Sequence, residues 1–394
     1  MAEVVDSRMP QWSEFVDLLK PAGELISDTF FPDSEQLRAQ LYQQLVMNLC
    51  LGYFLYFQSD ADHPDWTPFL NSVFMLQPNP DDTYFNAHLS GTGIYRIVGE
   101  RGTVKLLTFS LGQSVMGTSE SPDKSLAYVD VDDLAIEADG RFELTLSAER
   151  PAGHRGNWVR LPADANYILV RQRSYDWGVE RDARLAIERL DTPFIKPRTT
   201  APQIERGLRA VLGGFTARLS RRWILYQNTL LKRGLVNTLE MTDFGGAVPV
   251  QWYWQGLYQL SADECLILET ELPARRKYWN VQLNDELFNA VDFIHRQSSL
   301  NGHQARIDED GRFRAVISLE DPGVHNWLDP GGTLQGMLIG RWYDCDTRPV
   351  PTLTRVPLRR LWDHLPANST RITPTERVAA LSARRIGAQL RRRW

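Results

Sequence analysis

The sequence is poor in the residues that build disulfide frameworks and metal sites. It has only three cysteines, Cys50, Cys265 and Cys345, among 394 residues, and no C-x-x-C pair. An odd number of widely spaced cysteines gives no disulfide framework and favours a reducing compartment. We expect Cys50, which lies in an apolar run, to be a buried free thiol. The seven histidines form no His-x-His or His-x-x-x-His pair, so no metal site is expected.

Long apolar runs and leader-like segments are also absent. The longest apolar stretch, residues 45–57 (LVMNLCLGYFLYF), is too short and too interrupted to span a bilayer, and we expect a buried helix there. The first residues, MAEVVD, have neither the basic nor the apolar region of a secretory signal. These features predict a cytoplasmic protein.

Charge and motif content exclude further classes. The formal net charge of −5 argues against nucleic acid as the main partner, because phosphate binding needs a basic surface. The chain lacks a Gly-x-Ser-x-Gly nucleophile motif, a Walker Gly-x-x-x-x-Gly-Lys motif and a glycine-rich dinucleotide fingerprint. We therefore expect no cofactor.

What the sequence does contain is an internal repeat. Residues 136–147 (IEADGRFELTLS) align with residues 307–318 (IDEDGRFRAVIS), with six of twelve positions identical. Further matches follow in the same order and at a similar spacing: 106–111 with 278–283, 157–158 with 326–327, and 173–176 with 341–344. Matches that keep their order indicate a structural unit used twice.

Each copy of the repeat has the pattern of antiparallel β structure. Asp139-Gly140 and Asp310-Gly311 are tight-turn signals, because glycine adopts positive φ without strain, and an alternating strand follows each. A sheet with one apolar face must pack on another sheet. The prediction is an α+β chain of two tandem, internally duplicated antiparallel β-sandwiches, jelly-roll-like, with N-terminal, linking and C-terminal helical segments.

Periodicity divides the chain into five parts. We expect an N-terminal helical segment at 1–75, a first β-sandwich at 76–178, a linking helical segment at 179–245, a second β-sandwich at 246–358 and a basic C-terminal helix at 359–394. That basic helix could contact an anionic membrane or another protein, but we expect it to pack on its own protein and keep its arginines in water.

The second half resembles a known bacterial family. The resemblance rests on residues 277–285 (KYWNVQLND), 298–301 (SSLN), 310–311 (DG), 325–330 (HNWLDP) and 341–344 (RWYD). These are similar to the proteins classed as domain of unknown function 1214, and residues 79–84 (NPDDTY) resemble a motif of its companion, domain of unknown function 1254. The resemblance implies tandem β-sandwiches with helical additions and brings no established activity.

The repeat also sorts the polar residues. Those present in both halves are expected to be structural, since two sandwiches rarely carry two identical sites; they are Asn157/Asn326, Trp158/Trp327, Arg173/Arg341, Tyr175/Tyr343 and Asp176/Asp344. Residues found in one half only are better site candidates.

The densest one-half-only group lies after residues 277–285. In Asp292-x-x-His295-Arg296 a carboxylate can orient an imidazole and raise its basicity beside a cation. We predict His295 as a base, Asp292 as its orienting partner and Arg296 as an anion stabiliser. The predicted substrate-binding residues of this group are Asn284, Asp285 and Asn301. The alternative is a solvated loop with a local ion pair.

A second group lies on the expected strand 82–88. Alternation puts Asp82, Tyr84, Asn86 and His88 on one face. We predict Asp82 and Tyr84 as acid–base residues, and Asn86 and His88 as substrate-binding residues. The alternative is an edge strand whose polar face lies in water.

These features favour a cofactor-independent acid–base enzyme that carries out hydrolysis, elimination or isomerisation. Its substrate is expected to be a hydrophobic or ring-shaped small molecule, because aromatic residues make up 10% of the chain. The alternative is a non-catalytic β-sandwich module that binds glycan or apolar ligands, or a protein-interaction scaffold. A homo-oligomer is compatible with either function.

Overall fold

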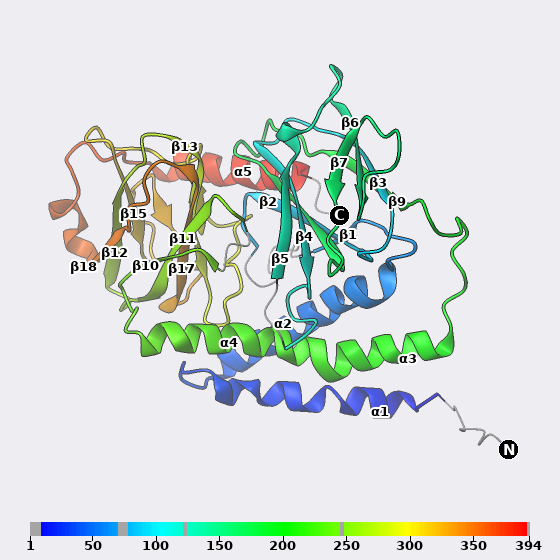
Figure 1. The fold of residues 1–394 in the computed structure, drawn as a ribbon. Helices are drawn as coiled ribbons and strands as arrows, with labels where there is room; N and C mark the ends of the chain where they lie inside the picture. The colour runs from blue at the N-terminus through cyan, green and yellow to red at the C-terminus, as the bar shows by residue number, and fades with distance from the viewer. Residues whose placement is uncertain (1–8, 70–77, 121–123, 245–247, 392–394) are drawn as a thin grey trace.

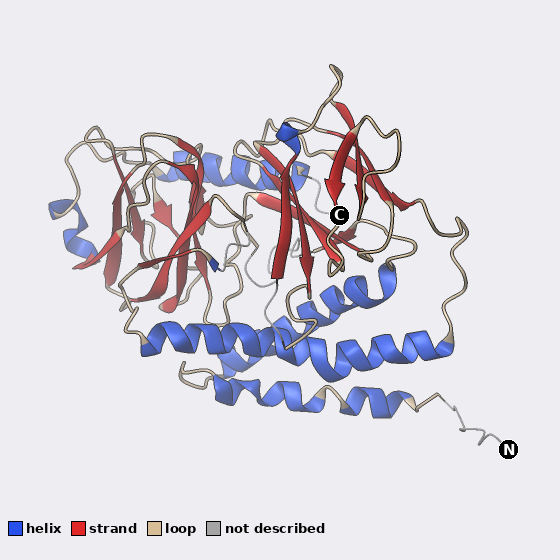
Figure 2. Ribbon diagram, in the orientation of Figure 1, coloured by secondary structure: helices blue, strands red, loops and turns tan. Residues whose placement is uncertain are grey.

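The computed structural model describes residues 9–69, 78–120, 124–244 and 248–391. Two groups of strands stand side by side, with helices along two sides of them (Figures 1 and 2). In each group a five-stranded sheet packs on a four-stranded sheet through an apolar core. Among the described residues, none of the helices combines the length and hydropathy needed to cross a membrane.

The first sandwich is built from nine strands. Its five-stranded sheet has the order β1 (Thr67–Pro68), β2 (Asp82–His88), β8 (Tyr167–Arg173), β4 (Leu106–Gln113) and β5 (Lys124–Asp130). Its four-stranded sheet has the order β7 (Asn157–Arg160), β6 (Arg141–Ser147), β3 (Tyr95–Glu100) and β9 (Arg184–Arg189).

The second sandwich repeats this arrangement strand for strand. Its five-stranded sheet has the order β10 (Glu240–Thr242), β11 (Gln251–Gln259), β17 (Gln335–Cys345), β13 (Arg276–Asn284) and β14 (Ser299–Asn301). Its four-stranded sheet has the order β16 (Trp327–Leu328), β15 (Arg312–Ile317), β12 (Glu264–Glu271) and β18 (Thr352–Pro357). The predicted duplication of a mostly antiparallel sandwich is confirmed.

Helices frame both sandwiches. The α-helices are α1 (Trp12–Asp17), α2 (Glu35–Tyr53), α3 (Ala201–Ala210), α4 (Thr216–Lys232) and α5 (Pro374–Leu390). Shorter helical turns are η1 (Lys20–Asp28), η2 (Phe54–Gln58), η3 (Val131–Asp133), η4 (Val211–Phe215) and η6 (Leu358–Asp363). Together α3, η4 and α4 run beneath both sandwiches, and α5 crosses the opposite side (Figure 1). The N-terminus of α5 is fixed by a capping box between Thr373 and Glu376.

Three local expectations are wrong. The C-terminal segment does not keep all its arginines in water, since Arg377 and Arg391 are buried. Cys50 is exposed rather than buried, because it lies off the stripe of α2 that packs inward, which contains Leu37, Leu41, Gln44, Asn48 and Leu51. The segment from 179 is not helical at its start, since β9 pairs with β3 and its Leu185 and Ile187 pack on the sandwich core. The helical link begins at Ala201. The expected boundaries at 75/76 and 245/246 lie outside the described residues.

The outer faces of the two five-stranded sheets are polar and yet buried. Such a face of an isolated antiparallel sandwich would lie in water. Here side chains of the two sheets meet: Arg173 Nη1 donates to Gln251 Oε1 at 2.9 Å, and the hydroxyls of Tyr128 and Tyr343 are 2.9 Å apart. We call these facing side chains the polar layer; its members are Asp82, Tyr84, Asn86, Tyr128, Arg171, Arg173, Gln251, Tyr253, Tyr278, Asn280, Gln282, Arg341 and Tyr343.

The core of the second sandwich leaves no room at Gly340 on β17. A Cβ atom there would lie 1.9 Å from the ring of Trp254, which is fully buried. We expect Gly340→Ala to lower the free energy of unfolding by about 1–3 kcal/mol, because the ring must shift within a packed core.

Urea-induced unfolding measures this loss. The control is Gly156→Ala, whose Cβ would meet nothing closer than 3.4 Å and should change stability by less than about 0.5 kcal/mol. Equal effects of the two substitutions would show that the packing around Gly340 is misassigned.

Candidate functional site

The polar layer centres on a buried ion pair. Asp82 and Arg173 are partners in the antiparallel ladder of β2 and β8. Arg173 donates from Nε to Oδ1 at 2.6 Å and from Nη2 to Oδ2 at 2.8 Å, and both side chains are 1% exposed. Burial acts to raise the pKa of Asp82, but the charge and hydrogen bonds of Arg173 outweigh it and lower that pKa. The Asp82 carboxylate therefore stays ionised.

The neighbouring Asp81 joins the first sandwich to the second. Its carboxylate accepts hydrogen bonds from Tyr278 Oη at 2.5 Å and Asn301 Nδ2 at 2.7 Å, both in the second sandwich, and from Trp177 Nε1 at 2.8 Å. Burial raises the pKa of Asp81 although these donors act to lower it. The sequence did not single out Asp81, because alternation assigned only Asp82 to the polar face.

Arg341 is the duplicate of Arg173 in a different environment. It is 3% exposed, and its Nη1 donates to Gln282 Oε1 at 2.7 Å. The residue across the ladder from Arg173 on β2 is Asp82, whereas the residue across from Arg341 on β11 is Tyr253. The Tyr253 ring lies 5.4 Å from the guanidinium. Within the described residues, no ion pair joins Arg341 to a carboxylate.

Tyr84 lies among these charges. Its hydroxyl donates to Asp82 Oδ2 at 3.1 Å. Burial and the Asp82 charge raise the pKa of Tyr84, so the hydroxyl keeps its proton at neutral pH. The charges of Arg341, Arg171 and Arg173 act to lower that pKa but do not outweigh burial. Of these three arginines, Arg173 forms the ion pair with Asp82.

The polar layer becomes apolar a short step along the same strands. Arg171 donates to Ser110 Oγ at 2.8 Å, and Leu169, two residues before it, is buried in an apolar cluster that also contains Ile339. Asn86 pairs with Leu169 in the ladder of β2 and β8 and is 0% exposed. Neither polar atom of its side chain has a hydrogen-bond partner. Unsatisfied polar atoms in a buried position are rare and call for a ligand or water.

The other predicted substrate-binding residues hold local structure. His88 Nε2 lies 2.6 Å from the Leu55 carbonyl oxygen. Asn284 Nδ2 donates to the Phe288 carbonyl at 3.1 Å, and Asp285 accepts the backbone N–H groups of Leu287 and Asn289. Asn301 contacts Asp81 as described. Of the predicted substrate-binding residues, only Asn86 lies in the polar layer with its side chain unpartnered.

The structure brings together two of the three predicted catalytic residues of the second half. His295 Nδ1 lies 2.9 Å from Asp292 Oδ2, and the imidazole side chain is 57% exposed. Arg296 turns away to form an ion pair with Asp329 at 2.8 Å. In the part of the chain that is described, no cluster of three or more His, Cys, Asp or Glu side chains could hold a metal ion.

Comparison with known proteins identifies the repeated unit. The family model described as "Protein of unknown function (DUF1214)" matches residues 87–176 and 259–347. The chain carries the DUF1214 domain twice. The first match begins within β2, so the first half, whose residues 79–84 suggest the companion domain, also carries DUF1214. No curated protein matches.

The fold is similar to that of one solved structure in particular, from Burkholderia cenocepacia. An uncharacterized protein from Burkholderia cenocepacia is 29% identical, with a TM-score of 0.79 over 88% of this chain and 97% of that chain. The VPA0106 protein from Vibrio parahaemolyticus is 13% identical, with a TM-score of 0.44 over 86% of this chain and all of its own length.

The two duplicated arginines should respond differently to substitution. Arg173→Met leaves the buried Asp82 carboxylate without its partner, which should lower the free energy of unfolding by about 3–5 kcal/mol. Arg341→Met removes a buried charge that has no ion-pair partner among the described residues, together with two hydrogen bonds, so the loss should be smaller, about 1 kcal/mol.

Urea-induced unfolding of ligand-free protein compares the two variants. The control is Arg184→Met, because that side chain is 75% exposed and pairs with Glu100 at the surface. Equal losses for Arg173→Met and Arg341→Met would contradict the assigned asymmetry.

Proposed function

We propose that this protein binds a small organic anion with an apolar body between its two sandwiches. The observation that supports this most is the Arg341 guanidinium, which is buried and has no carboxylate partner among the described residues. A charge taken out of water costs several kcal/mol unless it is paired. A ligand carboxylate would supply to Arg341 what Asp82 supplies to Arg173.

The surroundings of Arg341 define the chemistry of the ligand. A guanidinium binds a carboxylate through two parallel N–H···O bonds, and Arg171, the ladder partner of Tyr84, provides a second cation in the polar layer. The unpartnered amide of Asn86 can bond a polar substituent. Leu169 and Ile339 lie in the adjoining apolar cluster and suit a ring or an aliphatic chain. The ligand class is therefore an aromatic or aliphatic carboxylate.

The polar layer is better suited to binding than to proton transfer. Asp82 stays ionised because its pKa is lowered, and Tyr84 stays protonated because its pKa is raised. An acid–base catalyst needs a pKa near the working pH. We therefore propose ligand binding, rather than catalysis, as the function of the polar layer. We also propose a cytoplasmic location, since the cysteines are unpaired.

A cofactor-independent acid–base enzyme is the second candidate. The hydrogen bond between His295 Nδ1 and Asp292 Oδ2 supports it, because the carboxylate fixes the orientation of an exposed imidazole. If the bound ligand is turned over, His295→Ala and Asp292→Asn should each abolish turnover while the fold is kept, as measured by product formation and circular dichroism. Full activity of both variants would remove this candidate.

Isothermal titration with matched pairs of probes tests the binding proposal. Benzoate and decanoate should bind, whereas benzamide and decanol, which lack the charge, should not. Arg341→Met should weaken binding of the acids by at least about tenfold, since a buried charge-assisted contact exceeds 1.4 kcal/mol. Arg184→Met is the control and should bind as the wild type does.

Two results would contradict the proposal. One is equal binding of an acid and its neutral analogue, which would show that the charge is not recognised. The other is unchanged binding of the acids by Arg341→Met, which would place the ligand elsewhere.

A further inference from the structure

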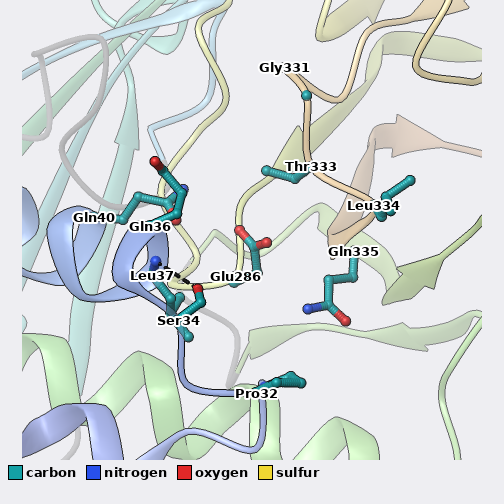
Figure 3. Close-up of a pocket in the computed structure, with 11 residues that line it drawn as sticks. Pro32, Ser34, Gln36, Leu37, Gln40, Glu286, Gly331, Thr333, Leu334 and Gln335 are labelled. Carbon is teal, nitrogen blue, oxygen red and sulfur yellow. Dashed lines mark hydrogen bonds between the residues drawn. The ribbon is translucent and has the colours of Figure 1, made fainter. Parts of the chain in front are cut away.

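A separate, open pocket lies between the start of α2 and the loop that precedes β17 (Figure 3). Its volume is about 400 Å³, which is within the range of small-molecule sites. The carboxyl group of Glu286 lies among the lining side chains of both elements, between Gln40 of α2 and Thr333 of the loop (Figure 3).

Local hydrogen bonds fix both walls of this pocket. Ser34 Oγ accepts the backbone N–H of Leu37 at 3.1 Å, which sets the start of α2 at the rim. Asp285 Oδ1 accepts the N–H groups of Leu287 and Asn289, and Gln44 Nε2 donates to the Leu287 carbonyl at 2.9 Å. The loop that carries Glu286 is therefore held against α2, and the pocket is preformed.

Glu286 is an unusual carboxyl group. One of its oxygens is buried and has no hydrogen-bond partner. Burial, followed by the charge of Asp285, raises the pKa of Glu286 to about 7, although a hydrogen bond from Gln40 acts against it. A cation close to this carboxyl group would stabilise its ionised form.

The titratable side chains that interact with Glu286 do not provide such a cation. Asp285 on the same loop and Tyr258 on β11 are the titratable groups that interact with it, and neither is cationic. Asp329, which also acts on Tyr258, already has a partner in Arg296 at 2.8 Å. No lysine, arginine or histidine is among the described residues that line the pocket.

We propose that this pocket binds a small organic cation, a primary ammonium group on a short apolar chain, with Glu286 as its counter-ion. The side-chain oxygens of Gln36, Gln40 and Thr333 can accept the remaining N–H bonds of the ammonium group. Leu37 and Leu334 line the pocket and can contact the chain. This site is distinct from the polar layer and does not depend on the anion proposal.

Titration calorimetry with n-butylammonium chloride on the full-length protein tests the proposal. The cation needs the ionised form of Glu286, and about a tenth of that carboxyl is ionised near pH 6 against about nine tenths near pH 8. The dissociation constant should therefore fall about tenfold between these two pH values.

Substitution and a neutral probe complete the test. Glu286→Gln should abolish binding, whereas Glu271→Gln, at an exposed ion pair with Arg312, should leave it unchanged. n-Butanol should not bind. Binding of n-butylammonium that does not change with pH, that survives in Glu286→Gln or that n-butanol matches would overturn the proposal. The pH series on wild-type protein decides the matter even if Glu286→Gln does not fold.

Discussion

Two adjacent carboxylates, Asp81 and Asp82, are the constraint on which the arrangement of the two sandwiches depends. Asp82 is paired within its own sandwich with Arg173, whereas Asp81 accepts hydrogen bonds from Tyr278 and Asn301 of the other. Each polar sheet face must bury its groups with partners, because an unpaired charge in the interior costs more than its packing returns. The two faces supply partners for most of each other's polar groups, and α4 and α5 cover the sides (Figure 1).

Duplication followed by divergence explains why this layer is not fully satisfied. The same strand position carries an arginine in both halves, yet only Arg173 has a carboxylate across the ladder, whereas Arg341 has Tyr253. A structural role alone would be served by a repeated ion pair. The missing carboxylate and the unpartnered Asn86 leave a positive, hydrogen-bonding centre next to apolar side chains. In the separate pocket at the start of α2, the Glu286 carboxyl group provides a centre of opposite charge.

Much of the fold could be predicted because the repeat is local in sequence. Asn157 and Asn326, expected to be structural, make the same set of bonds: each bridges a preceding loop to the neighbouring strand, β6 or β15. The alternation that placed Asp82, Tyr84 and Asn86 on one face is also confirmed. Burial of that face could not be predicted, since it arises from contacts such as Arg173 to Gln251 between halves. The expectation that repeated polar residues are structural also could not distinguish the role of Arg173 from that of Arg341, because the two arginines occupy equivalent positions of the repeat and differ in their partners.

The central claim is that a ligand's negative charge completes the polar layer at Arg341. Native mass spectrometry of the protein purified from its own host without denaturation tests it most directly. The account predicts that the wild type retains a small organic acid that Arg341→Met has lost, while both remain folded. Retention of the same molecule by both proteins, or of a neutral molecule in place of an acid, would contradict it.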